Sequence, residues 1–340
     1  MRDLVVVGGG PVGLATALYA ARAGLDVEVR EKRAGVIDKA CGEGLMPGAV
    51  AALTELGVAL EGHPIRGIRY VAPGHAVEAP FRHGEGRGVR RTVLHAALRD
   101  AVEQAGVPVV EHVVREVSDH GDHVLVDGEP TRHLVAADGL HSPVRRLLGL
   151  EAPASRLKRF GLRAHVPVAP WSDLVEVHWS PRAEAYVTPV SAHEVGVAVL
   201  SATPGPLEDL LGDFPMITER LPAGRLDGVR GAGPLRQRPT ARVAGRVLLV
   251  GDASGYVDAL TGEGIAVGLA QARAAVDAVV AGDPAGYEAA WRRVSWRHHL
   301  LTAALLQAGR LSVVRRHLVP TAARLPRVFG AAVNQLARPA

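Results

Sequence analysis

Residues 247–255, Val-Leu-Leu-Val-Gly-Asp-Ala-Ser-Gly, open with four consecutive apolar residues that end at a Gly-Asp turn. Such a run is typical of a strand buried on both faces of a parallel sheet. Leu260-Thr261-Gly262-Glu263-Gly264-Ile265 and an alanine-rich helical pattern follow. Glycines at the start of a helix let backbone amides come close to a flat or anionic group. The stretch therefore predicts the floor of a ligand site.

A second glycine turn lies near the N-terminus, where Val5-Val6-Val7 lead into Gly8-x-Gly10-x-x-Gly13. Gly8 permits the tight turn, Gly10 lets a pyrophosphate approach the backbone, and Gly13 allows the helix to pack closely on the strand. Glu31 ends the next predicted strand, where its carboxylate can bind ribose hydroxyls and would repel a 2′-phosphate. The pattern predicts a bound dinucleotide, and two distant glycine turns favour one long ligand that contacts both.

Length and composition limit the class of protein. The 340 residues are enough for one large α/β body or two joined domains, and 48% hydrophobic residues can fill a core. A single cysteine, Cys41, excludes an internal disulfide and favours a reducing cytoplasm. The chain begins on a predicted strand and has no apolar run long enough to span a membrane, so we expect neither a signal peptide nor an anchor. The 15 histidines show no metal-ligand spacing, and we expect neither a metal nor a nucleic-acid partner.

Further motifs carry a family resemblance. Arg91-x-x-Leu94-x-x-x-Leu98 is followed by Asp138-Gly139 with Ser142 and Arg145, and then by the Gly251 to Ile265 stretch. Together with the first glycine turn and Glu31, this order resembles the FAD-dependent oxidoreductases, which include group A aromatic hydroxylases, flavin halogenases and geranylgeranyl reductases. The match runs from residue 1 to about residue 280. The resemblance implies non-covalent FAD, with Arg91 at its phosphates or ribityl chain, Val114 beside the adenine, and Asp138 supporting FAD and transient NAD(P)H docking.

The last glycine turn supplies groups suited to the flavin end of FAD. Asp252 can bond a ribityl hydroxyl, which only a flavin carries. Backbone amides of Gly262, Gly264 and Ile265 can face the pyrimidine edge, where negative charge collects on reduction. We therefore expect Gly251 and Asp252, with the amides of the Gly262 to Ile265 loop, to bind FAD.

The pattern of strands and helices divides the chain into interleaved parts. Residues 65–71 and 75–81 predict a paired ribbon, and alternation within 160–200 predicts antiparallel strands with one covered face. Prolines 284, 320 and 326 are expected helix boundaries. We predict an α/β protein with a discontinuous Rossmann-like FAD-binding domain containing a parallel sheet (1–64, 91–150, 240–282), an antiparallel-sheet substrate domain (65–90, 151–239) and a C-terminal helical segment (283–340).

Two loops distinguish branches of the superfamily. Residues 39–45, Lys-Ala-Cys-Gly-Glu-Gly-Leu, and residues 260–265 are most similar to the geranylgeranyl reductases. Ala259 replaces a proline common to reductases and hydroxylases, and the Trp-x-Trp-x-Ile-Pro element of the halogenases is absent. Cys41 is the candidate catalytic proton donor over the flavin; the alternative is a small packed residue beside the cofactor. Glu43 is the other acid in this loop, and its side chain can instead have the structural role of bonding backbone amides.

Two reactions stay open at this point. NADH or NADPH would reduce FAD, which either activates O₂ to hydroxylate an aromatic or polyketide-like hydrophobic substrate, or passes hydride to an isoprenoid C=C bond. The abundance of monooxygenases in the superfamily, and the lack of a large extra domain for long prenyl chains, favour hydroxylation. The two loops favour reduction. A third alternative is a flavin-free peripheral membrane module.

The C-terminal segment is basic. From Trp291 to Ala340 there are nine arginines and no acidic residue, interleaved with apolar clusters. Such a tail can contact an anionic membrane surface weakly or guide an apolar substrate. The alternative, which follows the usual behaviour of amphipathic helices, is an arginine-rich solvated face on helices packed against the body. His298 and His299 are expected on a helix surface.

Overall fold

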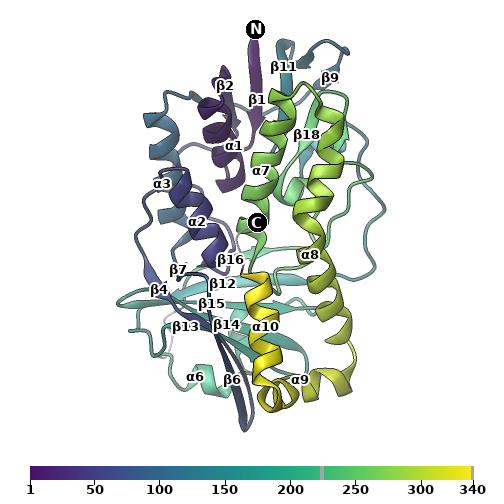
Figure 1. The fold of residues 1–340 in the computed structure, drawn as a ribbon. Helices are drawn as coiled ribbons and strands as arrows, with labels where there is room; N and C mark the ends of the chain where they lie inside the picture. The colour runs from purple at the N-terminus through teal and green to yellow at the C-terminus, as the bar shows by residue number, and fades with distance from the viewer. Residues whose placement is uncertain (223–225, 338–340) are drawn as a thin grey trace.

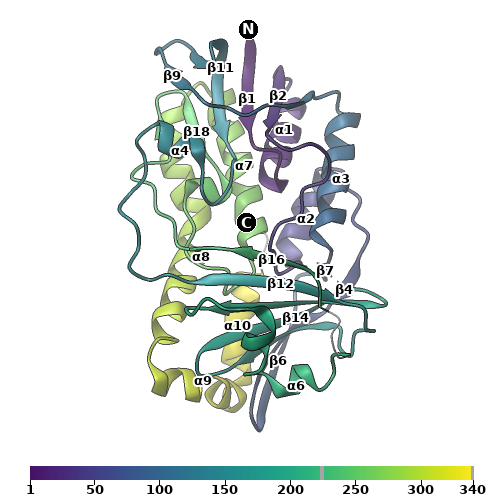
Figure 2. The same ribbon diagram turned by 180° about the vertical axis from the view of Figure 1, so that it is seen from behind.

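The computed structural model describes residues 1–222 and 226–337. An eight-stranded sheet lies at the end that holds the N-terminus, and a seven-stranded sheet lies at the other end (Figures 1 and 2). Helices pack on both sheets, and the C-terminal helices run from the first sheet to the far end of the second. Parallel and antiparallel sheets with C-terminal helices confirm the predicted α/β class.

The eight-stranded sheet has a parallel centre. Its main path follows the order β17 (Val243–Ala244), β18 (Val247–Leu249), β11 (Glu129–Ala136), β1 (Arg2–Val7), β2 (Val27–Glu31) and β8 (Val109–Glu111). The pairs from β18 to β8 are parallel, and β17 is antiparallel to β18. Strands β9 (Val117–Asp119) and β10 (Val124–Val126) extend β11 as an antiparallel meander.

Strand β1 shows why uninterrupted apolar runs form this sheet. Leu4 and Val6 belong to the apolar cluster that includes α1 and α7, whereas Val5 and Val7 belong to the cluster on the opposite face. Because both faces are covered, each side chain in these positions must be apolar. One face carries α1 (Pro11–Arg22), α2 (Pro47–Glu55), α3 (Arg91–Gln104) and α7 (Gly264–Val280), and the other carries α4 (Pro143–Leu147) (Figures 1 and 2).

The seven-stranded sheet is mostly antiparallel. It follows the order β16 (Asp227–Ala232), β12 (Phe160–Val166), β15 (Glu194–Ser201), β14 (Ala183–Ser191), β13 (Leu174–Trp179), β5 (Gly67–Ala72) and β6 (His75–Pro80). Only the β13–β5 pair is parallel. Strands β5 and β6 form the predicted ribbon.

The prediction of one covered face for this sheet is wrong, because apolar side chains cover both faces of its centre. Val187 on β14 packs with α5 (Leu207–Leu211) and α6 (Pro215–Thr218). Its neighbour Tyr186 packs on the opposite face with side chains from the C-terminal helices. Eight of the nine residues of β14 are accordingly buried.

A small antiparallel sheet joins the two halves. It consists of β3 (Gly44–Leu45), β7 (Gly86–Gly88) and β4 (His63–Ile65). A Cβ at Gly88 would lie 1.7 Å from the carbonyl oxygen of Pro189, so β7 and β14 approach with their backbones in contact. This junction holds the end of the loop that runs from β2 toward the second sheet.

The C-terminal segment forms η2 (Pro284–Gly286), α8 (Tyr287–Ala308), α9 (Ser312–Arg324) and α10 (Pro326–Leu336). Pro284 and Pro326 begin helical elements, as expected. Pro320 lies inside α9, so the boundary predicted there is wrong. Its neighbour Val319 is fully buried in the second sheet's apolar cluster. The free energy gained by this burial offsets the cost of the helical hydrogen bond that is missing at the proline. Within the two described ranges, no helix is both long and apolar enough to cross a bilayer.

Candidate cofactor and active site

The first glycine turn connects β1 to α1 in a conformation that needs glycine. Gly8 has a φ of 108°, and a Cβ there would lie 2.5 Å from the carbonyl oxygen of Ala137. A Cβ at Gly13 would lie 1.8 Å from the carbonyl oxygen of Gly8. Gly10 is the N-cap of α1 and no side chain caps the helix, so its first amides are available to an anion.

Glu31 lies beside this turn at the end of β2. Its Oε2 accepts a hydrogen bond from the Gly9 amide at 2.7 Å, and its Oε1 accepts one from Arg33 Nε at 2.8 Å. Burial opposes ionisation, but the bonds from Arg33 and Gly9 outweigh it and lower the pKa of Glu31. Oε1 also accepts from the Arg33 amide at 3.2 Å, whereas Oε2 keeps a second lone pair and can still accept a bond from a ribose hydroxyl.

Arg91 provides the first test of whether an anionic cofactor fits. It begins α3, is 7% exposed, and its Nε has no hydrogen-bond partner among the described residues. Its Nη2 lies 3.8 Å from where a Cβ would stand at Gly10. Desolvation lowers the pKa of Arg91, although nearby Cys41 and Asp252 oppose this shift. A buried cation beside free helix amides is costly without a counter-ion, and a diphosphate would supply one.

The second glycine turn follows β18 as η1 (Gly251–Ser254). Gly251 has a φ of 58°, and its amide donates to Gln271 Oε1 at 2.8 Å. A Cβ at Gly251 would lie 3.2 Å from the side chain of Val12, in the first turn of α1. The two glycine turns therefore meet across one side chain, as a single long ligand requires.

Asp252 lies among cations in this turn. Burial raises its pKa, and Lys39 and Arg91 oppose the shift as the nearest positive charges. Lys39 Nζ lies 3.3 Å from the position of a Cβ at Gly139, at the end of β11. A carboxylate, two cations and the free amides at the start of α1 thus gather from distant parts of the chain. Such a donor and acceptor set fits the diphosphate and hydroxyl groups of FAD.

The Asp138 to Arg145 motif supports the second turn. Asp138 Oδ2 accepts from the Val144 amide at 2.9 Å, and its Oδ1 is buried without a partner within the described ranges. Arg145 is 1% exposed and donates to the carbonyl oxygens of Ala253 and Leu140, each at 2.9 Å. The sequence motif included Arg145 without giving it a role; the structure makes it the clamp between β11 and η1.

The flavin-side loop ends at α7. Gly262 has a φ of 70°, and Gly264 begins α7, whose N-cap residue Glu263 makes no capping bond. Ile265 is half-buried and packs against the first sheet's apolar cluster. Val114 lies in the apolar cluster on the opposite face of that sheet. Its contact with adenine, like the other assigned contacts with FAD, stays a prediction.

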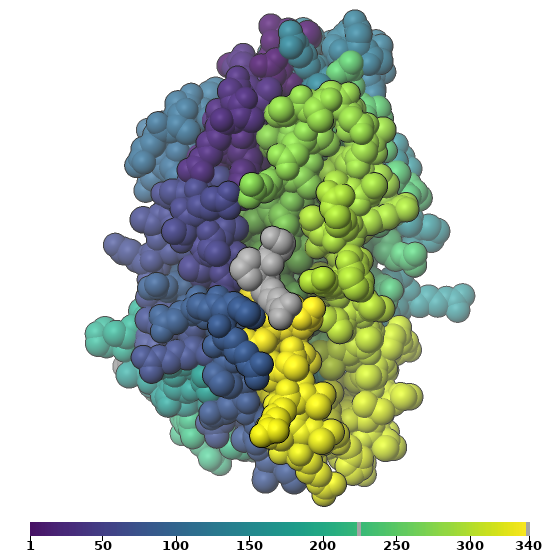
Figure 3. Space-filling view, viewed as in Figure 1, coloured from purple at the N-terminus to yellow at the C-terminus, as the bar shows by residue number. Residues whose placement is uncertain are grey.

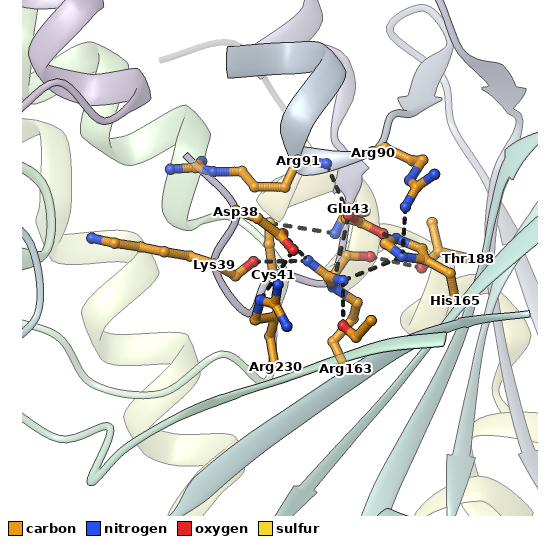
Figure 4. Close-up of polar contacts among 12 residues, drawn as sticks. Asp38, Lys39, Cys41, Glu43, Arg90, Arg91, Arg163, His165, Thr188 and Arg230 are labelled. Atoms are coloured by element: carbon orange, nitrogen blue, oxygen red, sulfur yellow. Dashed lines mark hydrogen bonds and ion pairs between the residues drawn. The ribbon is translucent and has the colours of Figure 1, made fainter. Parts of the chain in front are cut away.

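The loop that contains Cys41 is fixed by Glu43 (Figure 4). Glu43 adopts a positive φ of 59° and is 3% exposed. Its Oε1 accepts from the Arg91 amide at 2.8 Å, and its Oε2 pairs with His165 Nε2 at 2.7 Å. The alternative considered for Glu43, a bond to a backbone amide, is thus observed, together with an unforeseen hydrogen bond to His165. Glu43 couples the start of α3 to strand β12.

Further polar contacts attach this loop to the second sheet. Arg163 on β12 pairs with Asp38 and donates to the carbonyl oxygen of Lys39 at 3.1 Å. Thr188 on β14 donates to the carbonyl oxygen of Gly42 at 2.9 Å. In Figure 4 the side chains of Lys39 and Arg91 extend away from these contacts on one common side. The loop therefore has one side fixed to the sheet and one side directed at the glycine turns.

Cys41 lies at the centre of this loop and is partly accessible. Desolvation raises the pKa of its thiol, against the opposing effect of Arg91. The Glu43 amide lies 3.5 Å from Cys41 Sγ. The role of this thiol as a proton donor stays a prediction.

His298 departs from its predicted position on a helix surface. It is 6% exposed, and its Nδ1 lies 3.2 Å from Glu263 Oε2. The prediction is wrong because α8 crosses from one sheet's apolar cluster to the other, and this face of the helix is covered. Sequence reasoning also missed Arg163 and His165; their spacing of two on a strand was the available signal that they share a face.

Comparisons with known proteins agree with this site. Residues 1–212 match the family model described as FAD binding domain. A menaquinone reductase of Mycolicibacterium smegmatis is 31% identical over 87% of this chain and 81% of its own. A chloroplastic geranylgeranyl diphosphate reductase of Oryza sativa is 29% identical over 83% of this chain and 67% of its own. A solved geranylgeranyl bacteriochlorophyll reductase-like protein of Thermoplasma acidophilum has a TM-score of 0.80 at 21% identity, covering 98% of this chain and 95% of its own.

The family model covers more than half of the chain, and the menaquinone reductase spans most of it. The glycine turns, the buried Arg91 and Asp252 fit the cofactor that the family model names. The chain belongs to the FAD-dependent oxidoreductases, in the superfamily that unites the group A flavin monooxygenases with the geranylgeranyl reductases.

Proposed function

We propose that this protein reduces carbon–carbon double bonds in the polyprenyl chain of a lipid, such as a prenylated quinone. Menaquinone and geranylgeranyl diphosphate, the compounds named for the two relatives above, have little in common except a polyprenyl chain. The loops at 39–45 and 260–265 resemble the reductase branch as well. This choice departs from the hydroxylation favoured by the sequence alone, because the relatives at 31% and 29% identity are both named as reductases.

The observation that carries the proposal is the position and protonation of Cys41. Glu43 holds the loop by bonding the Arg91 amide on one side and His165 on the other. Desolvation keeps the thiol protonated by raising its pKa. A reductase of an unactivated alkene needs a proton donor near the hydride source, whereas a hydroxylase does not require a thiol.

The chemistry divides between the cofactor and the chain. Bound FAD, reduced by a nicotinamide nucleotide, supplies a hydride to one alkene carbon. Cys41 gives its proton to the other carbon, the π bond is consumed, and the thiolate recovers a proton from solvent. Arg91 and the α1 amides bind the anionic end of the cofactor, and Asp252 accepts from its hydroxyls.

An apolar region beside the flavin-side loop suits a prenyl chain. Tyr186 on β14 donates to the carbonyl oxygen of Leu260 at 2.9 Å and ties this loop to the second sheet. Leu260 and Leu235 belong to the same buried apolar cluster as Tyr186 and Trp179. An isoprene unit that inserted among such side chains would leave water for apolar surroundings, which lowers its free energy.

Product mass separates the two reactions. FAD-loaded protein is incubated with NADH or NADPH and a prenylated naphthoquinone, under air and under nitrogen. After any quinol has been reoxidised to the quinone, reduction of an alkene leaves a gain of two hydrogens in both atmospheres. A gain of one oxygen that disappears under nitrogen would instead establish hydroxylation, and protein that cannot be loaded with FAD would contradict both.

Substitution of Cys41 tests the proton donor. We expect Cys41→Ala to slow alkene reduction by about a hundredfold or more, the usual contribution of general acid catalysis. Flavin reduction by NAD(P)H, followed by its absorbance, should stay unchanged because it needs no proton from this loop. Cys41→Ser should retain more activity than Cys41→Ala. Equal rates for Cys41→Ala and the wild type would remove Cys41 from the mechanism.

A further inference from the structure

Large exposed apolar side chains are concentrated on the C-terminal helices. Seven of the sixteen such residues in the described chain lie between positions 296 and 328, which is less than a tenth of its length. Five of them define the α9 surface: Leu311, Val313, Val314, Leu325 and Val328. These five residues lie at the two ends of α9, where it meets α8 and α10.

The α9 surface forms one end of the molecule. Helix α9 and the adjoining ends of α8 and α10 lie at the end opposite the N-terminus in both views (Figures 1 and 2). The space-filling view shows α10 and the lower part of α8 at the surface of this end (Figure 3). The side chains of the α9 surface range from 37% to 65% exposed. Exposed apolar residues gathered in this way indicate a contact surface.

The opposite side of the same helices is firmly packed. Val319 on α9 and Val333 on α10 are buried in the second sheet's apolar cluster. Arg315 also faces inward, where it pairs with Glu184 at 2.5 Å and lies over the Trp179 ring at 5.3 Å. The exposed apolar residues therefore lie on a second face of helices that are already anchored. The expected packing of the C-terminal helices against the body explains the buried face and leaves the exposed one unexplained.

The charge around the α9 surface is positive. Arg316, Arg324 and Arg327 are exposed, and none forms an ion pair with another described residue. No acidic residue occurs from Trp291 to Ala340. A second copy of this chain would bring the same uncompensated charge to such an interface, whereas a surface of anionic lipids would neutralise it.

We propose that the α9 surface docks the protein on an anionic lipid bilayer, with apolar side chains in the headgroup boundary and arginines on the lipid phosphates. Leucine and valine gain free energy on leaving water, and each arginine near an anionic surface adds attraction. Docking orients the second sheet's apolar cluster toward the lipid phase, where prenylated molecules partition. The inference does not depend on which reaction the flavin site performs.

Vesicle sedimentation tests the proposal with FAD-loaded protein. We expect binding to phosphatidylcholine vesicles that contain about 30 mol% phosphatidylglycerol, weak binding to phosphatidylcholine alone, and loss of binding at high salt. Arg316→Gln with Arg324→Gln and Arg327→Gln should lower the affinity for anionic vesicles by about a hundredfold. Leu311→Ser with Val313→Ser and Val314→Ser should weaken binding to the same vesicles.

Matched controls lie at the opposite end of the molecule. Arg115→Gln with Arg132→Gln and Arg146→Gln changes net charge equally, and Val110→Ser with Val113→Ser and Leu147→Ser removes three apolar groups that are 41% to 50% exposed. FAD absorbance and thermal unfolding verify that each variant is folded. Both control variants should bind like the wild type. Absence of wild-type binding, equal loss in the controls, or a dimer in sedimentation velocity that the α9 variants abolish would overturn the proposal.

Discussion

At the scale of single residues, Glu263 and His298 show how burial decides protonation. They lie 3.2 Å apart, and burial raises the pKa of Glu263 to about 9 and lowers that of His298 to about 4. Both groups are therefore uncharged at neutral pH, with a carboxylic acid that donates to the imidazole. Since Glu263 Oε1 is buried without a described partner, ionisation would leave an uncompensated charge beside α7.

This pair predicts how stability depends on pH. Glu263 has a folded pKa above its ordinary 4.5, so its stabilising contribution is complete below pH 4.5 and is lost as the pH rises toward 9. His298 has a depressed pKa, so its contribution is complete above pH 6.5. Between pH 6.5 and 9 Glu263 is the member of this pair whose contribution changes, and that contribution to the free energy of unfolding should fall by about 1.4 kcal/mol per pH unit.

Denaturant unfolding of FAD-saturated protein at several pH values measures this slope. Glu263→Gln cannot ionise, so its stability should stay nearly constant from pH 6.5 to 9. Glu55→Gln, at an exposed position on α2, should keep the wild-type slope. A slope shared by all three proteins would show that Glu263 is ionised in the folded state.

At the scale of elements, Arg145 joins two turns that we expect to contact the cofactor. From α4 its guanidinium donates to carbonyl oxygens after β11 and in η1. Arg145→Met should lower the free energy of unfolding by about 3 kcal/mol, because buried carbonyl groups lose their donors. Arg146→Met, in the same helix but exposed, should change it by less than about 0.5 kcal/mol. Equal effects in chemical denaturation would mean that the clamp contributes nothing specific.

The elements also show what the sequence could predict. The runs at Val5–Val7 and Val247–Val250 identify strands because a sheet covered on both faces requires apolar residues throughout. The glycine turns can be recognised in the sequence because there is no room for a side chain at Gly8 or at Gly13. The partners of Glu43 could not be predicted from the sequence. His165 is 122 residues away and comes close to Glu43 only when the second sheet has formed.

At the scale of the whole molecule, the two glycine turns form one site because a late part of the chain, η1 and α7, packs against α1. Val12 contacts Gly251, and a Cβ at Gly268 would lie 2.5 Å from Val12 Cγ2. This packing places the two glycine turns side by side, as the two ends of the expected ligand path. A ligand that reaches both ends should be held more strongly than one that reaches only the first.

Comparison of ADP with FAD tests this arrangement. Both contain the adenosine diphosphate unit, but only FAD carries the ribityl chain expected at Asp252. ADP should raise the melting temperature of the apoprotein slightly and FAD much more, since stabilisation grows with affinity. Asp252→Asn should weaken FAD by about tenfold or more and leave ADP unchanged, because one bond to a charged acceptor is lost. Arg91→Met should weaken both ligands, whereas the exposed control Asp277→Asn should weaken neither. If Asp252→Asn weakened ADP and FAD equally, the last glycine turn would not bind the flavin half.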